Sequence, residues 1–165
     1  MEIRRAREGD VEGLLKLLVQ VNMVHHLGRP DLFKGPTTKY SKEDLMELLG
    51  DDNKPVFVCI VDNEVAGHAF CVISEFKDNR LMEDCKTLYI DDICVDEGRR
   101  GEHVGRSLYE YVEGYARDIG CHNITLNVWE CNPGARAFYE AMGMGVQKTG
   151  MEKILDDQRC DGSTR

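Results

Sequence analysis

The residues best suited to chemistry lie between positions 88 and 106, where a β-forming run is followed by glycines and arginines. The run Leu-Tyr-Ile-Asp-Asp-Ile-Cys-Val predicts a strand, and helical spacing begins near residue 104. A helix N-terminus presents free N–H groups and partial positive charge, so it attracts anions. Gly101 and Gly105 let a phosphate approach the backbone. Positive charge comes from Arg99, Arg100 and Arg106. The segment indicates an anion site; the alternative is an ordinary turn with solvated arginines.

This turn lacks the two common nucleotide-binding patterns. No Gly-Lys-Ser/Thr follows the glycines, so the turn is not a P-loop with a lysine for the phosphates and a hydroxyl for Mg²⁺. The pattern G-x-G-x-x-G is also absent, which excludes the dinucleotide-binding fingerprint. A phosphate here would depend on backbone N–H groups and arginines.

A second segment also joins a predicted strand to a helix. Residues 132–143 read Asn-Pro-Gly-Ala-Arg-Ala-Phe-Tyr-Glu-Ala-Met-Gly, with proline suited to a first helical turn and glycine to a helix end. Together, the two segments resemble the GNAT N-acetyltransferase superfamily. The family's turn, (Q/R)-x-x-G-x-(G/A), is matched by residues 100–105 except at His103, where the family has glycine. The later pattern, N-x-x-A-x-x-(F/Y)-Y-x-x-x-G, is matched throughout.

The resemblance covers residues 2–155 and implies direct acetyl transfer from acetyl-CoA to an amine, with no metal. It implies a backbone N–H near Cys94 for the thioester oxygen and Tyr139 as proton donor to the leaving thiolate. The residues that it implies for acetyl-CoA binding are Ile93, Cys94, Val95, Arg100, Gly101, Glu102, His103, Val104, Gly105, Arg106, Asn132, Ala135, Phe138 and Tyr139.

The acceptor amine must lose a proton before it attacks. An alkyl amine with a pKa near 10.4 is neutral about once in 2,500 molecules at pH 7, and a carboxylate can draw the proton away through water. The run Leu-Tyr-Ile-Asp-Asp is similar to diamine, polyamine and thialysine acetyltransferases, where the first acidic residue, here Asp91, has this role. Asp91 and Asp92 are neighbours in a strand, so we expect them on opposite faces. Glu130 is the second candidate base.

Acceptor contacts are expected from one side of the site. The candidates are His26, Phe33, Asp92, Trp129 and Glu130. The simpler alternatives are a solvated histidine pair at a helix end and core packing of Trp129.

The elements that must position these residues predict an α/β GNAT fold. We expect a single mixed central β-sheet flanked by helices, in the order β-α-α-β-β-β-α-β-α-β. The predicted strands are 2–6, 55–61, 65–76, 88–95, 123–129 and 146–155. Asp10 is placed to cap the first helix, a loop follows at 25–36, and Ser41 to Asp44 form a capping box. Residues 1–155 form one domain, and 156–165 are a polar tail.

Composition excludes several classes. The 165-residue chain has a formal net charge of −9, the wrong sign for a general nucleic-acid binder. No apolar run approaches the roughly 20 residues of a membrane span, and the N-terminus lacks an apolar signal core. The seven cysteines include no C-x-x-C pair, which favours reduced thiols and a cytoplasmic location over disulfides or zinc.

The sequence therefore predicts an N-acetyltransferase acting on a small cationic amine, either a polyamine or a lysine-like compound. Two alternatives stay open. The acceptor could be an aminoglycoside or a protein amine, since the fold alone does not decide this. The domain could instead be a non-catalytic acyl-CoA sensor, with His103 marking an altered site. A homodimer is a possible assembly.

Overall fold

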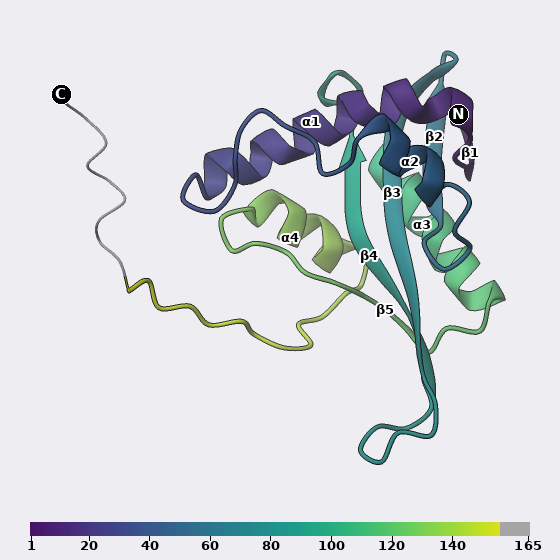
Figure 1. Ribbon diagram of the computed structural model, residues 1–165, viewed down its shortest axis with the longest axis vertical. Coiled ribbons are helices and arrows are strands. Elements are labelled where there is room, and N and C mark those ends of the chain that lie inside the picture. Colours follow the sequence, from purple (N-terminus) through teal and green to yellow (C-terminus); the bar gives the residue numbers. More distant parts are fainter. Residues whose placement is uncertain (156–165) are drawn as a thin grey trace.

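Five strands form one mixed sheet in the computed structural model, which describes residues 1–155 (Figure 1). The first four strands pair antiparallel, and the fifth pairs parallel with the fourth. In sheet order they are β1 (Glu2–Arg5), β2 (Val56–Val61), β3 (Glu64–Phe76), β4 (Cys85–Val95) and β5 (Asn123–Leu126). The predicted α/β class and single mixed sheet are confirmed.

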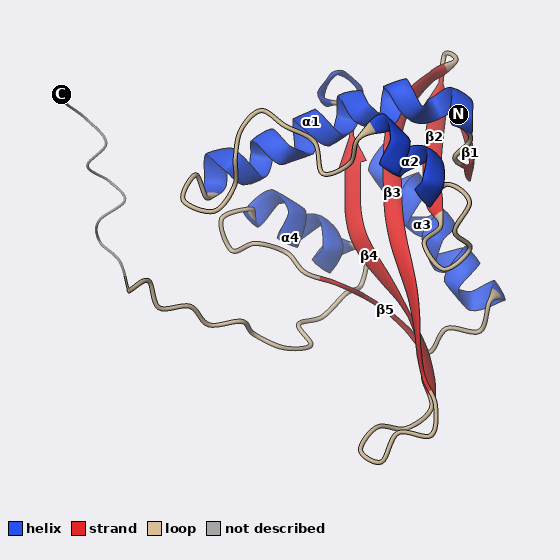
Figure 2. Ribbon diagram, viewed as in Figure 1, coloured by secondary structure: helices blue, strands red, loops and turns tan. Residues whose placement is uncertain are grey.

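Helices cover both faces of the sheet, as Figure 2 shows. They are α1 (Val11–Gly28), α2 (Lys42–Leu48), α3 (Val104–Asp118) and α4 (Pro133–Ala141), with 3-10 turns η1 (Glu8–Asp10) and η2 (Glu97–Arg99). Alternation along β2 divides the core: Val56 and Val58 pack with α1 and α2, whereas Phe57 and Cys59 pack with α3. The site residues of β4 therefore lie on a sheet that is fixed from both sides.

The first helix differs from its prediction at both ends. It runs to Gly28, so His25 and His26 lie in its last turn and not in a loop. Asp10 stands at the N-cap position, but its carboxylate makes no cap hydrogen bond to α1. The carboxylate accepts two hydrogen bonds from Arg4, at 2.7 and 2.9 Å, and one from the backbone N–H of Arg7. Asp10 therefore joins β1 to η1. The capping box is confirmed, because Ser41 Oγ accepts from Asp44 N and the Asp44 carboxylate accepts from Ser41 N.

The predicted last strand, 146–155, does not form. This segment extends away from the sheet without regular structure (Figure 1). A strand needs a neighbour to pair with, and among residues 1–155 the segment has none. Its apolar side chains are exposed, with Val146 at 70%, Met151 at 91% and Leu155 at 84%. The predicted tail, 156–165, lies outside the described residues.

Candidate functional site

The candidate site begins where β4 and β5 separate. The two strands pair from Thr87 and Asn123 to Ile90 and Leu126. Beyond this point β5 ends, shorter than predicted, while β4 continues to Val95 (Figure 2). On this side of β4, residues 91–95 have no strand partner within the described chain. Their backbone polar groups form an open edge that can hydrogen-bond an extended ligand.

The predicted acetyl-CoA residues converge on this edge from three elements. The end of β4 supplies Ile93, Cys94 and Val95; the turn and α3 supply Arg100, Gly101, Glu102, His103, Val104, Gly105 and Arg106; α4 supplies Asn132, Ala135, Phe138 and Tyr139. Gly105 shows how closely they meet. A Cβ added there would lie 3.4 Å from Val95 Cγ2 and 3.6 Å from Phe138 Cε2. The end of β4, the start of α3 and α4 therefore meet at Gly105. That these residues bind acetyl-CoA stays a prediction.

The arginine turn leaves the N-terminus of α3 open. Gly101 and His103 both have positive φ, at 87° and 63°, and no side chain of the described part of the chain caps the helix. The backbone N–H groups of the first helical turn are thus available to an anion. The family has glycine where this chain has His103. The left-handed backbone explains that preference, because a side chain there costs about 1 kcal/mol.

Gly67 is a site residue that sequence reasoning missed. It lies in β3, directly under the start of α3. A Cβ there would lie 2.8 Å from Leu108 Cδ1 and 2.9 Å from the Cys94 carbonyl oxygen. A glycine inside a strand often marks such a close approach, which is the signal that could have identified it. Gly67 therefore sets how near the α3 N-terminus comes to β4.

Tyr139, on α4, packs against the part of the core that α3 covers. Asn132 caps that helix, with its Oδ1 accepting from Ala135 N at 3.1 Å. The Tyr139 ring packs against Phe138 and Tyr109. Burial raises the pKa of the Tyr139 hydroxyl above its ordinary value, and the negative charge of Asp92 raises it further. The hydroxyl therefore stays protonated at neutral pH and can donate a proton.

The two neighbouring aspartates lie on one face of the sheet, so the expectation of opposite faces is wrong. Phe70 pairs with Asp92 and Cys71 with Ile90, which leaves Asp91 as the extra residue of a β-bulge. A bulge interrupts the alternation of side chains. Asp91 forms an ion pair with Lys39, and Asp92 contacts His68.

Ring contacts place these two partners on the same face. Tyr40, which follows Lys39, stacks on Phe70 with centroids 5.6 Å apart, and Phe70 meets the His68 ring at 4.9 Å. Phe70 itself packs in the α1 and α2 half of the core. Both carboxylates therefore face the side of the sheet that α1 and α2 cover.

His68 is a second residue that sequence reasoning missed. It is fully buried in β3, and its Nε2 lies 3.2 Å from Asp92 Oδ2. With Asp92 ionised, a neutral ring must carry its proton on Nε2 to donate this hydrogen bond. Nδ1 is then a buried acceptor without a hydrogen-bond partner among residues 1–155. The signal was a histidine inside the apolar run 65–73.

The residues predicted for the acceptor side are only partly brought together. The Phe33 ring packs edge-on against Trp129 at 5.4 Å and stacks on His25 at 5.1 Å. Within residues 1–155, His26 makes no ring contact with this group; its Nδ1 lies 2.7 Å from the Phe33 carbonyl oxygen. Glu130 points into solvent, with a 92% exposed side chain paired to Arg136. The rings that pack together are therefore those of His25, Phe33 and Trp129.

The Cys94 thiol lies on the face of the sheet that α1 covers. Its Sγ lies 3.7 Å from the Leu17 carbonyl oxygen of α1. Burial raises the pKa of this thiol to about 12, with a further rise from Asp92. The thiol is therefore protonated at neutral pH and unsuited to nucleophilic attack.

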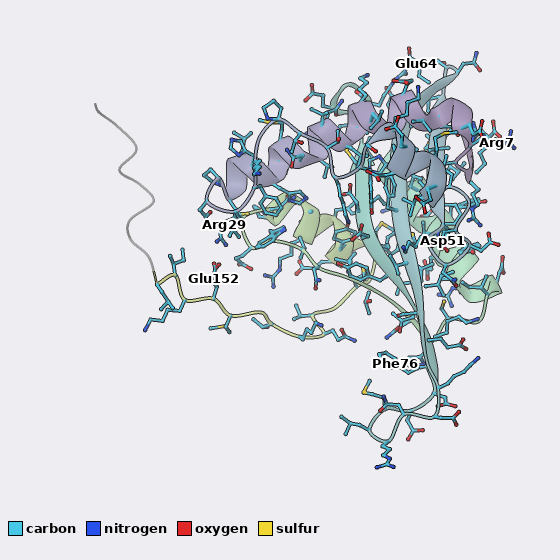
Figure 3. The ribbon with its side chains drawn as sticks, in the orientation of Figure 1. Arg7, Arg29, Asp51, Glu64, Phe76 and Glu152 are labelled. Atoms are coloured by element: carbon cyan, nitrogen blue, oxygen red, sulfur yellow. The ribbon has the colours of Figure 1, made fainter. Side chains whose placement is uncertain are left out.

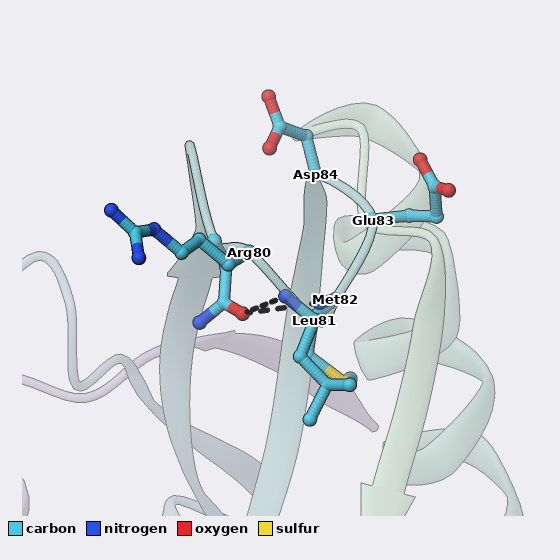
Figure 4. Close-up of a pocket in the computed structure, with 6 residues that line it drawn as sticks. Arg80, Leu81, Met82, Glu83 and Asp84 are labelled. Carbon is cyan, nitrogen blue, oxygen red and sulfur yellow. Dashed lines mark hydrogen bonds between the residues drawn. The ribbon is translucent and has the colours of Figure 1, made fainter.

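A hollow in the β3–β4 loop lies apart from this site. It is lined by residues 79–84, and Asn79 Oδ1 accepts hydrogen bonds from the backbone N–H groups of Leu81 and Met82 (Figure 4). The lining side chains are exposed, and none belongs to either motif. Within residues 1–155, no helix is both long enough and apolar enough to cross a membrane.

Comparisons with known proteins agree with this geometry. Residues 21–144 match the model of the Acetyltransferase (GNAT) family. The chain is 27% identical over 108 residues to a glucosamine 6-phosphate N-acetyltransferase of Arabidopsis thaliana, covering 65% of this chain and 68% of that protein. It is 28% identical over 151 residues to the thialysine N-epsilon-acetyltransferase of Bos taurus, covering 86% and 82%. A crystal structure of a mutant BH1408 protein from Bacillus halodurans superposes with a TM-score of 0.89 at 30% identity, covering 94% of this chain and 99% of that one.

Proposed function

The chain belongs to the acetyltransferase (GNAT) family and is an acetyl-CoA-dependent N-acetyltransferase, and we propose that its acceptor is the primary amine of a small cationic molecule. A polyamine and a lysine-like compound both fit this description. The observation that carries the proposal is the pair of carboxylates, Asp91 and Asp92, on one face of β4 beside the open edge.

The open edge and the arginine turn suit acetyl-CoA. The backbone at 93–95 can bind the extended pantetheine part, and the uncapped N-terminus of α3 can bind the pyrophosphate. Arg100 in the turn is exposed and adds positive charge. A backbone N–H near Cys94 would stabilise the thioester oxygen as the amine attacks.

Asp91 and Tyr139 supply the proton transfers in this proposal. Asp91 accepts the proton of the ammonium through a water molecule, and Tyr139 donates a proton to the departing sulfur. The Tyr139 hydroxyl is protonated at neutral pH, as the second role requires, although its raised pKa makes it a weaker acid. The ion pair between Lys39 and Asp91 supports the first, because it shows that this carboxylate binds an alkyl ammonium.

The two curated relatives differ in the acceptor that their names give. A glucosamine 6-phosphate acceptor brings a phosphate, which carboxylates repel, whereas a thialysine-like acceptor brings ammonium groups, which they attract. The two aspartates and the net charge of −9 therefore favour the cationic acceptor. An aminoglycoside, also cationic, is the second candidate.

A thiol-release assay with acetyl-CoA tests this proposal. The panel contains spermidine, putrescine, thialysine, lysine, glucosamine 6-phosphate, an aminoglycoside and a short peptide. We expect release with a small di- or polyamine or a lysine-like amine, reduced in Asp91→Asn. Release with glucosamine 6-phosphate alone would contradict the acceptor class. Tight CoA binding without release from any amine would favour the sensor.

We also propose that a second copy of the chain covers the segment 146–155. This segment carries the β-forming pattern that predicts a strand, yet its apolar side chains are exposed. Arg29 holds it near the end of α1 through an ion pair with Glu152 at 2.9 Å (Figure 3). β5 forms an edge of the sheet, with an unpaired side within the described residues. In a homodimer, the second copy would cover the apolar side chains of 146–155 and pair with the free side of β5.

We also propose that the protein is located in the cytoplasm. All six cysteines in residues 1–155 are free thiols, as expected in a reducing compartment. Cys160, the seventh, lies outside the described residues.

A further inference from the structure

A lysine of the chain occupies the carboxylate to which we assign the first proton transfer. Lys39 lies between α1 and α2, and its Nζ forms an ion pair with Asp91 Oδ2. The same Nζ lies 5.3 Å from the centroid of the Tyr40 ring. A carboxylate and an aromatic face are the two groups that bind an alkyl ammonium in proteins. In this structure the ammonium bound by Asp91 and Tyr40 is the side chain of Lys39.

The reacting group of Lys39 is the same as that of a lysine-like acceptor. Both are primary amines on flexible alkyl chains, and both need a carboxylate to take the proton. The Asp91 side chain is only 23% exposed, and Lys39 pairs with its Oδ2, so a free amine would compete with Lys39 for this oxygen. Lys39 therefore stands where the acceptor amine is expected to bind.

We propose that, without an acceptor, the protein acetylates its own Lys39, an inference that rests on the proposed function. Lys39 Nζ gives one proton to Asp91 and forms a bond to the acetyl carbonyl carbon. The carbon–sulfur bond breaks, and Tyr139 gives a proton to the sulfur. The Nζ proton that remains in excess passes to solvent, and Tyr139 is reprotonated from Asp91. The products are an acetylated Lys39 and free CoA, with no change of oxidation state.

Acetylation would change the acceptor site. The amide carries no charge, so it leaves Asp91 without its ammonium partner. The carboxylate is then free to bind a cationic acceptor. Lys39→Gln, which resembles the acetylated side chain, should therefore lower the KM for the amine several-fold.

Lys42 provides a matched control within three positions. It is exposed, as Lys39 is, and its Nζ lies 2.6 Å from Glu12 Oε1 of α1. Its ion pair has the same chemistry, but its carboxylate belongs to neither motif. Non-enzymatic acetylation by acetyl-CoA would modify both lysines.

The test is peptide mass spectrometry of the full chain incubated with acetyl-CoA and no amine. We expect Lys39 to be acetylated at least about ten-fold faster than Lys42, at a rate independent of protein concentration. Asp91→Asn should bring Lys39 to the rate of Lys42, and an active amine should slow its acetylation.

Two results would overturn the inference, and they differ in what they say about the proposed function. If amines of the panel release thiol but Lys39 is modified no faster than Lys42, self-acetylation is wrong and the transferase stands. If neither the amines nor Lys39 are acetylated, both the self-acetylation inference and the proposed function are wrong. Selective acetylation of Lys39 supports the inference whatever the panel shows.

Discussion

Tyr139 of α4 carries a hydroxyl that is protonated at neutral pH, and its side chain packs against the core that α3 covers. Its pKa lies above the ordinary tyrosine value because of burial first and the charge of Asp92 second. A thiol has an ordinary pKa of about 8.5, so proton transfer from a tyrosine is uphill by roughly 2 kcal/mol or more in water. Tyr139 can therefore contribute only if its proton moves to the sulfur while negative charge is still developing there.

Replacing Tyr139 by phenylalanine should separate binding from chemistry. The ring still packs on Tyr109 and Phe138, so the KM for acetyl-CoA should change little. Loss of a positioned acid should lower kcat by about 10²-fold, measured by steady-state thiol release. Tyr111→Phe, on the exposed side of α3 against Phe57, is the control and should keep full activity. A fully active Tyr139→Phe would remove the assigned role.

The ion pair of Asp10 and Arg4 should make stability depend on pH. Hydrogen bonds from Arg4 hold the pKa of Asp10 below its ordinary value. A lowered folded-state pKa stabilises the fold above the unfolded value of about 3.9, and this contribution is lost as pH falls through the folded pKa. Asp10→Asn should cost about 2 kcal/mol at pH 7, and the difference from wild type should shrink in acid.

Denaturant titrations at pH 7 and in acid measure this effect. Glu8→Gln, an exposed carboxylate of the same 3-10 turn, is the control and should change stability by less than about 0.5 kcal/mol. An equal loss for Asp10→Asn at both pH values would show that the charge is not responsible.

At the scale of elements, the site depends on how closely α3 approaches β3. The contact point is Gly67, where an added Cβ would lie 2.9 Å from Val104 Cγ1 and from a backbone carbonyl oxygen of β4. The carbonyl oxygen cannot turn aside, so the two strands must shift locally, and the Val104 and Leu108 side chains press the start of α3 outward. Such a shift would move the anion-binding N–H groups away from the open edge.

Gly67→Ala should therefore weaken both folding and binding. We expect a loss of about 1–3 kcal/mol in the free energy of unfolding and a higher Kd for CoA, measured by calorimetry. Gly114→Ala on the open side of α3, where a Cβ would meet nothing within 4 Å, is the control. It should stabilise the helix by up to about 1 kcal/mol and leave the Kd unchanged. An unaltered Kd for Gly67→Ala would contradict the packing argument.

Elements set by local signals could be predicted from the sequence. The Ser41–Asp44 capping box, Pro133 in the first turn of α4 and the periodicity of α3 depend on residues within one or two helical turns. The bulge at Asp91 could not be predicted, because it depends on how β4 pairs with Phe70 and Cys71. Burial of His68 likewise depends on the helix layer above it. The missing last strand depends on a pairing partner.

At the scale of the whole molecule, the exposed segment 146–155 leads us to expect a dimer. If a second copy covers it, the chain should sediment as a dimer at micromolar concentration. Met151→Glu combined with Leu155→Glu should shift the protein to monomer, because charges on the buried side of an interface are costly. Leu81→Glu, at a side chain 90% exposed in the β3–β4 loop, is the control and should stay dimeric. A wild type that is monomeric at every concentration would contradict the proposal.

We expect Asp91 and Asp92 to make this acetyltransferase select a cationic amine. The most direct test is the ratio of kcat/KM for thialysine to that for glucosamine 6-phosphate, measured for the wild type and for the Asp91→Asn, Asp92→Asn double variant. We expect a ratio well above one in the wild type and a lower ratio in the variant, because the two side chains lose their negative charge. A wild-type ratio below one, or a ratio that the double variant leaves unchanged, would contradict it.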